Sequence, residues 1–185
     1  NILKEKFMKK KLCSLIFAGI IVASATMPIQ AAEISTINGV AVEMGDSVEN
    51  FVDDNSAEAV VKGIQQRGSI IDTATVEISN LGKGDIGIMV ETLAHVECSH
   101  IKQIAILERQ EDDGTWKEVS RYQYDAYKKD FPTEDLSGMT NSFTVKNQKT
   151  DYYYRVTAIH YVEANGKGQS FFTRTDGIKI TEYGD

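Results

Sequence analysis

Proline, cysteine and tryptophan are scarce in this chain of 185 residues, which contains two, two and one of them. So little proline excludes a collagen-like or proline-rich chain, and so few cysteines exclude a disulfide-stapled scaffold. Hydrophobic residues make up 42% of the chain, and its mean hydropathy of −0.27 is too low for several membrane spans. The composition therefore indicates a globular protein with one main domain.

Long hydrophobic runs are also rare, and the run near the start has a basic flank. Residues 12–22 form an apolar stretch directly after three consecutive lysines, and the chain continues to the small residues Ala31 and Ala32. This order is typical of a secretory signal peptide, and the stretch is shorter than the about 20 residues of a membrane span. We therefore expect residues 1–32 to be a signal peptide and the protein to be secreted and extracellular, with cell-surface association left open.

Basic charge becomes scarce once such a peptide is removed. Residues 33–185 hold 15 basic and 26 acidic side chains, so their net charge is −11. An acidic surface repels phosphate backbones and anionic lipids, so we expect neither nucleic-acid binding nor membrane insertion after signal cleavage. Cys98 is then the one cysteine left, and without a partner thiol it is predicted to be a buried, unreactive structural residue.

The segment 33–68 is predicted to be an acidic leader, because it holds seven acidic and two basic side chains and shows no alternation of polar and apolar residues. Within it, Asn55 stands three residues before Glu58 and an apolar run follows, a pattern typical of a helix N-terminus, and Gly68 supplies a stop signal. The sequence therefore predicts one short helix over about 56 to 67, outside the main domain.

A different period begins near residue 73. Apolar and polar side chains alternate over residues 74–79, which predicts a half-buried strand. Asp113-Gly114 between two apolar-rich runs is a strong hairpin signal. Because alternation and turn residues continue to about residue 180, we predict an all-β, two-sheet sandwich of about seven strands over residues 69–185.

Two stretches resemble the fibronectin type III family of immunoglobulin-like sandwiches. Residues 152–159 with the glycine-rich turn after them look like the sixth strand and closing hairpin of that family, and residues 101–106 with the hairpin around Trp116 look like its third strand and hairpin. The resemblance implies that Tyr152 is the corner tyrosine, whose hydroxyl bonds the backbone, and that Tyr154 points inward with it. Tyr152, Tyr154 and Trp116 are then structural residues.

The whole layout also resembles a family of small secreted proteins of unknown function from Gram-positive bacteria. That resemblance implies a bacterial, extracellular protein and adds no chemistry.

Candidate catalytic and metal-binding residues are few. His95, Glu97, Cys98 and His100 lie within six residues, but a strand would point them to alternate faces, so we expect no metal site. Cys98 with His100 or His160 is a candidate nucleophile and base, although no local motif supports the pair. We therefore expect no catalytic residue, no cofactor and no enzyme activity.

One cluster of aromatic side chains lies beside polar residues and a proline-containing loop: Tyr122, Tyr124, Tyr127 and Phe131. Exposed aromatic rings stack on sugars, whereas a sheet edge covered by a loop buries them, and burial is favoured over ligand binding here. The expected function is a secreted, non-catalytic binding or interaction module for an unknown extracellular protein or glycan. The alternatives are a carbohydrate-binding accessory domain and, third, a hydrolase that depends on Cys98.

The signal-peptide prediction fixes an N-terminus that can be measured. Intact-mass analysis of the exported protein is expected to show a chain that begins at Ala32 or Glu33, because signal peptidases cleave after small residues. A membrane-bound form that still carries residues 12–22 would contradict the prediction of export.

Overall fold

The computed structural model describes residues 35–37, 40–42, 48–62 and 69–182. All of them belong to the structural unit Ala32–Asp185. The expected signal peptide, residues 1–32, lies outside the described residues, and so do parts of the acidic leader.

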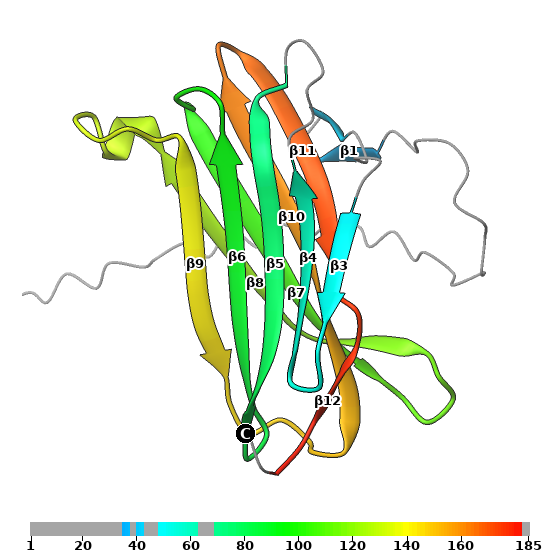
Figure 1. Cartoon of the computed structure of the whole chain (residues 1–185). Coiled ribbons are helices and arrows are strands. Elements are labelled where there is room, and N and C mark those ends of the chain that lie inside the picture. Colours follow the sequence, from blue (N-terminus) through cyan, green and yellow to red (C-terminus); the bar gives the residue numbers. More distant parts are fainter. Residues whose placement is uncertain (1–34, 38–39, 43–47, 63–68, 183–185) are drawn as a thin grey trace, which may run out of the picture. The chain divides into compact units, whose positions relative to one another are not determined.

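Two antiparallel sheets face each other in this unit (Figure 1). The first, which we call the β5 sheet, has the order β3-β4-β5-β6-β9, with β3 (Val48–Val52), β4 (Ser56–Lys62), β5 (Ile71–Gly82), β6 (Asp85–Ala94) and β9 (Gly138–Val145). The second, the β10 sheet, has the order β11-β10-β7-β8, with β7 (His100–Gln110), β8 (Trp116–Tyr127), β10 (Tyr152–Ala164) and β11 (Lys167–Arg174). The short strand β12 (Ile178–Ile180) also pairs with β10. Strands β1 (Ser35–Ile37) and β2 (Val40–Val42) pair with each other, and the 3-10 turn η1 (Lys128–Asp130) lies between β8 and β9. The prediction of an all-β chain with two sheets is therefore confirmed.

The predicted helix over about 56 to 67 is wrong where the structure describes it. Ser56–Lys62 forms strand β4, which pairs with β5 from Ser56 opposite Ser79 to Lys62 opposite Thr73. Its inward side chains Ala57, Ala59 and Val61 are at most 1% exposed. In a strand, a period of two buries all three side chains against the core. Pairing with β5 therefore outweighs the capping pattern that favours a helix. Residues 63–68, the rest of the predicted helix, lie outside the described residues.

This correction moves the start of the sandwich and raises the number of strands. The sheet begins at β3, on the N-terminal side of residue 69, where the sequence placed the domain boundary. The strands β3 and β4 and the separate strand β12 take the count above the about seven that were expected. The acidic leader is thus partly built into the sheet.

The core consists of two apolar clusters that contain side chains from both sheets. One includes Val76, Ile88 and Tyr154, and the other includes Ile71, Val162 and Phe171. Burial of this kind of surface is the main favourable term in folding, at roughly 25 cal/mol per Å². Because residues 35–182 include no second cysteine, the described part of the chain has no disulfide to add to it.

A buried polar layer lies between the two clusters. Gln103 on β7 and His160 on β10 are opposite each other in register and are both 0% exposed. The His160 ring bonds Thr92 Oγ1 through Nδ1 and Thr173 Oγ1 through Nε2, both at 2.8 Å. Gln103 Nε2 donates to Thr92 Oγ1 at 2.9 Å and to the Met139 carbonyl at 2.8 Å. Since these bonds connect β6 and β9 to β7, β10 and β11, the polar layer joins the two sheets.

The tyrosine that bonds the backbone near the start of β10 is Tyr154 and not Tyr152. Tyr154 is 0% exposed, and its hydroxyl donates to the Lys149 carbonyl at 3.0 Å. Tyr152 shares its face of the strand but is only partly buried, with the Arg109 guanidinium 5.1 Å from its ring centroid. The tyrosine that bonds the backbone is therefore two residues later than expected but still lies on the inward face of β10. Tyr153 lies on the other face and is 47% exposed, as alternation predicts.

Tyr154 is expected to contribute more to stability than Tyr152. Replacement of Tyr154 by Ala should lower the free energy of unfolding by about 3 to 5 kcal/mol, because it removes a fully buried ring. Tyr154→Phe should cost about 1 kcal/mol through the lost hydrogen bond. Urea denaturation of these variants and of Tyr152→Ala measures the order, and a larger loss for Tyr152→Ala would contradict the assignment.

The burial of His160 makes the stability of the fold depend on pH. Burial lowers the pKa of His160 to about 3, whereas the unfolded chain protonates it near pH 6.5. Stability from the neutral ring is therefore complete above pH 6.5 and falls as the pH decreases toward 3, by about 1.4 kcal/mol per pH unit. We expect His160→Gln to flatten the pH dependence of unfolding between pH 6.5 and 5.

Exposed His95 provides the matched control for this experiment. His95→Gln removes a histidine whose side chain is 47% exposed and should leave the slope unchanged. An equal slope in the unaltered protein and in His160→Gln would show that the folded protein admits the His160 proton.

Candidate functional site

The aromatic residues proposed from the sequence do not form one surface. Tyr122 and Tyr124 point between the sheets, where their ring centroids lie 4.5 and 5.7 Å from that of Phe143 on β9. Tyr122 packs against the core, and both side chains are partly buried. These two tyrosines close the side of the sandwich between β8 and β9.

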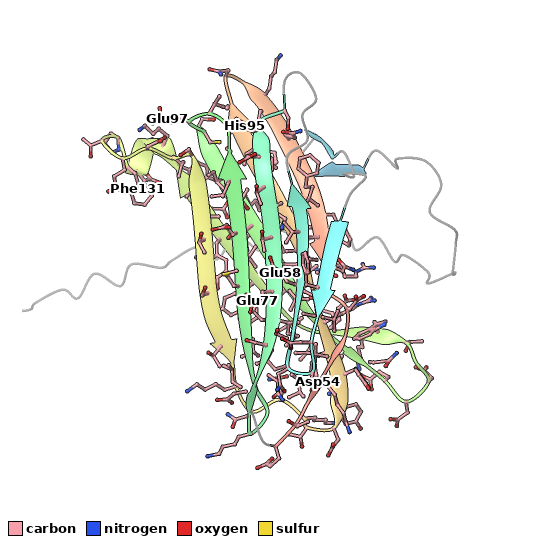
Figure 2. All side chains as sticks on the ribbon, viewed as in Figure 1. Asp54, Glu58, Glu77, His95, Glu97 and Phe131 are labelled. Atoms are coloured by element: carbon pink, nitrogen blue, oxygen red, sulfur yellow. The ribbon has the colours of Figure 1, made fainter. Side chains whose placement is uncertain are left out.

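Tyr127 lies on the other face of β8 and stacks on His100, with ring centroids 4.1 Å apart and planes at 10°. His100 Nε2 also bonds Asp125 Oδ1 at 2.8 Å, and Lys129 Nζ lies 5.0 Å from the Tyr127 ring centroid. Phe131 is 43% exposed on the loop beyond β8 (Figure 2). Tyr127, at 37% exposure, stacks on His100 with one face of its ring, and Phe131 follows η1. Since Tyr122 and Tyr124 point to the other face of β8, the four rings provide no shared platform.

A better candidate is a hollow of about 450 Å³ at the opposite side of the sandwich. It lies where the edge strand β11 and the connection from β11 to β12 approach the first residue of β8 and the edge strand β3. The lining residues are Asn50, Trp116, Arg155, Phe172, Arg174, Thr175, Asp176 and Gly177. We call it the arginine hollow, because two guanidinium groups are its main charged groups.

Strand register brings the charged groups together. Arg155 on β10 is opposite Glu108 on β7, and Thr157, two residues further along β10, is opposite Arg174 on β11. Arg155 Nε and Nη2 donate to the two carboxylate oxygens of Glu108 at 2.9 and 3.2 Å. Thr157 Oγ1 donates to Glu108 at 2.9 Å and accepts from Arg174 Nε at 2.9 Å. One carboxylate therefore organises a row that contains two cations.

The two guanidinium groups differ in their partners. Arg155 forms a bidentate ion pair with Glu108, and its Cζ lies 4.2 Å from the ring centroid of Trp116. Arg174 has no carboxylate within ion-pair distance among the described residues, and its Cζ lies 4.8 Å over the Phe172 ring. Burial and then the neighbouring Arg155 lower the pKa of Arg174, against the effect of Glu108. An arginine keeps its proton in proteins, so Arg174 stays charged in surroundings that disfavour its charge. An anion bound beside the guanidinium would compensate that charge.

Trp116 is held at the edge of the hollow by a close backbone approach. A Cβ atom on Gly177 would lie 2.7 Å from the Trp116 ring, so a larger residue at this position would have to displace the indole. With Arg155 over its face and Gly177 at its edge, the indole is a structural wall of the hollow. The structural role expected for Trp116 is consistent with these contacts.

A second, shallow hollow of about 390 Å³ lies on the outer face of the β5 sheet and has the opposite character. Its ionisable lining residue is Glu77, which is opposite Glu58 in register (Figure 2). Burial, then Glu58 and Asp53, raise the pKa of Glu77. The two hollows therefore differ in sign, and only the arginine hollow suits an anion.

Cys98 is buried as predicted, at 1% exposure. Burial, with smaller effects from Asp135 and Glu97, raises the pKa of its thiol to about 11, and Sγ donates to the Val96 carbonyl at 3.5 Å. His160 has both ring nitrogens engaged by threonines, and His100 Nε2 bonds Asp125. The thiol is therefore held in its protonated form and hydrogen-bonded to a carbonyl, an arrangement that does not activate it as a nucleophile.

The remaining candidate metal ligands are also engaged elsewhere. His95 Nε2 lies 3.6 Å from Asp72 Oδ1, and Glu97 pairs with Lys128. Within residues 35–182, apart from the gaps, no three histidine, cysteine or acidic side chains come close enough to hold a metal ion.

Comparison with known proteins assigns no relative: no protein-family model matches the chain, and no curated protein matches it either. In the segments that the structure describes, none of the helices is long and apolar enough to cross a membrane. The arginine hollow therefore has to be interpreted from its own geometry.

Sequence analysis did not find the arginine hollow. The only local signal is an arginine on a strand beside aromatic residues, in Tyr154-Arg155 and again in Phe172-Thr173-Arg174. Nothing in the sequence shows that these two arginines lie in adjacent rows of one sheet, since the pairing of β10 with β11 and β7 decides that.

Proposed function

We propose that this protein is an exported, non-catalytic binding module that recognises an oxyanion, a carboxylate or a sulfate, in the arginine hollow. The observation that carries the proposal is Arg174, a cation without an ion-pair partner among the described residues, next to a second guanidinium in a concave site. Planar guanidinium groups bind carboxylates and sulfates through paired, charge-assisted hydrogen bonds.

The contrast with the rest of the protein supports this site. The chain has a formal net charge of −7, and the other hollow contains Glu77. In the arginine hollow two guanidinium groups face Glu108, which pairs with Arg155, and the lining carboxylate Asp176, so the hollow is less acidic than the rest of the surface. Such a site attracts an anion at short range, while the surrounding surface repels polyanions such as nucleic acids.

Binding fits the described chemistry better than catalysis. The Cys98 thiol is buried with a raised pKa and donates to the Val96 carbonyl, while His160 has both ring nitrogens bonded to threonines and His100 pairs with Asp125. The alternative of a carbohydrate-binding domain is kept in a specific form: the ligand is an acidic glycan held by its carboxylate or sulfate. Stacking on a neutral sugar is less favoured, because guanidinium groups already cover Trp116 and Phe172.

The immunoglobulin-like, fibronectin type III-like type of the sandwich is part of this proposal. The bond from the Tyr154 hydroxyl to the Lys149 backbone supports it, because a tyrosine at the start of a strand has this role in such sandwiches.

Loss of the Arg174 charge is expected to weaken oxyanion binding. In an NMR titration with inorganic sulfate, Arg174→Gln should raise the dissociation constant about 10-fold or more, because a hydrogen bond to a charged group contributes about 1.5 to 3 kcal/mol. Asp176→Asn should lower it, because the change removes a like charge from the lining.

Arg121→Gln is the matched control, since it removes an exposed guanidinium that pairs with Glu118 outside the hollow. An equal loss of affinity in Arg121→Gln would mean that net charge, and not the hollow, attracts the anion. A uronic-acid oligosaccharide and a glutamate-rich peptide, titrated separately, distinguish a glycan from a protein as the source of the carboxylate.

A further inference from the structure

The edge strand β9 differs from the other edges of the two sheets. Its residues, Gly138 to Val145, include no charged side chain and no proline. Its pairing with β6 runs through eight residues without a register shift, whereas the pairing of β7 with the edge strand β8 shifts after Leu107. In the described part of the chain, no strand pairs with the outer side of β9 (Figure 1).

Proteins protect exposed sheet edges with charges, prolines, bulges or short strands. The other edges follow this rule: β8 has a register shift and carries Glu118, Arg121 and Asp125, β11 carries Lys167 and Arg174, and β3 has five residues. The flat, uncharged edge of β9 retains the backbone groups that pair with a further strand.

We propose that β9 pairs with β9 of a second copy of this chain, in an antiparallel arrangement centred on Ser142. The charges around the strand favour this occupant. Glu134 and Asp135 precede β9, while Lys146 and Lys149 follow it, and all four are exposed. Antiparallel pairing places the acidic end of each copy beside the basic end of the other.

The register follows from the two-fold symmetry. Directly opposite residues in an antiparallel pair point to the same face, so the symmetry axis passes beside one residue of β9. With Ser142 on the axis, Thr140 lies opposite Thr144 of the second copy, and Gly138 lies opposite Lys146 of that copy. Thr140, Ser142 and Thr144 are exposed on the outer face of the β5 sheet, so the new contact there is a row of hydroxyl groups.

Charge also explains why a like copy can approach at this edge. Two chains of net charge −7 repel each other, and contact is least unfavourable along an edge strand whose own residues carry no acid, as in β9. The arginine hollow lies at the β3 and β11 edges, so a dimer through β9 leaves it open. The proposal is therefore independent of oxyanion binding.

Sedimentation equilibrium of the full chain tests the dimer. We expect a dimer in the micromolar range, and Ser142→Lys should weaken the association at least 10-fold, because it places two like charges opposite each other on the axis. Gln123→Lys, the same change of charge at an exposed position of the edge strand β8, should leave the association unchanged. Equal thermal unfolding curves show that both variants fold.

A cross-linking experiment tests the register. Ser142→Cys should form a disulfide-linked dimer in a mild redox buffer, while Cys98 stays buried and reduced. Lys167→Cys, at the exposed first residue of β11, should give none. A monomer at 100 µM or above, a dimer unaffected by Ser142→Lys, or equal cross-linking of the two cysteine variants would each overturn the proposal. Arg174→Gln, which tests the oxyanion site, should leave the dimer intact.

Discussion

The register between β7 and β10 determines much of this structure. It places Gln103 opposite His160 on the inner face and Glu108 opposite Arg155 on the outer face. The inner pair holds the polar layer that joins the two sheets, and the outer pair organises the arginine hollow. Because side chains alternate between faces, a slip of one residue would expose the polar layer and bury an ion pair.

The polar layer makes this register specific. Apolar strands can slide against each other at little cost, whereas a buried polar group without a hydrogen-bond partner costs about 1 to 3 kcal/mol. Asn141 Nδ2 donates to Gln103 Oε1 at 2.8 Å, which extends the layer to the edge strand β9. The same network thus fixes how the β5 sheet is aligned with the β10 sheet. It also makes the fold sensitive to acid through His160, whose protonation would break it.

The two edges of the sandwich have different roles in our proposals. At β3 and β11 the sheets leave a concave site with two guanidinium groups, which suits an anion. At β8 and β9, Tyr122 and Phe143 close the space between the sheets and leave a flat, uncharged strand, which suits another strand. In the sequence, Tyr122 and Tyr124 resemble a platform for sugar stacking. In the structure, they pack against Phe143 and close this side of the sandwich, whereas the other side stays open at the arginine hollow.

The sequence by itself determined the fold class, the period of two from about residue 73 onward, the burial of Cys98 and the inward face shared by Tyr152 and Tyr154, because these depend on local alternation and residue chemistry. Tertiary structure decided the rest. Ser56–Lys62 became a strand because β5 offered it a partner, although its capping signal favours a helix. The arginine hollow formed because Arg155 and Arg174, nineteen residues apart, lie in neighbouring rows of one sheet. Strand register is a relation between distant segments, so no local pattern contains it.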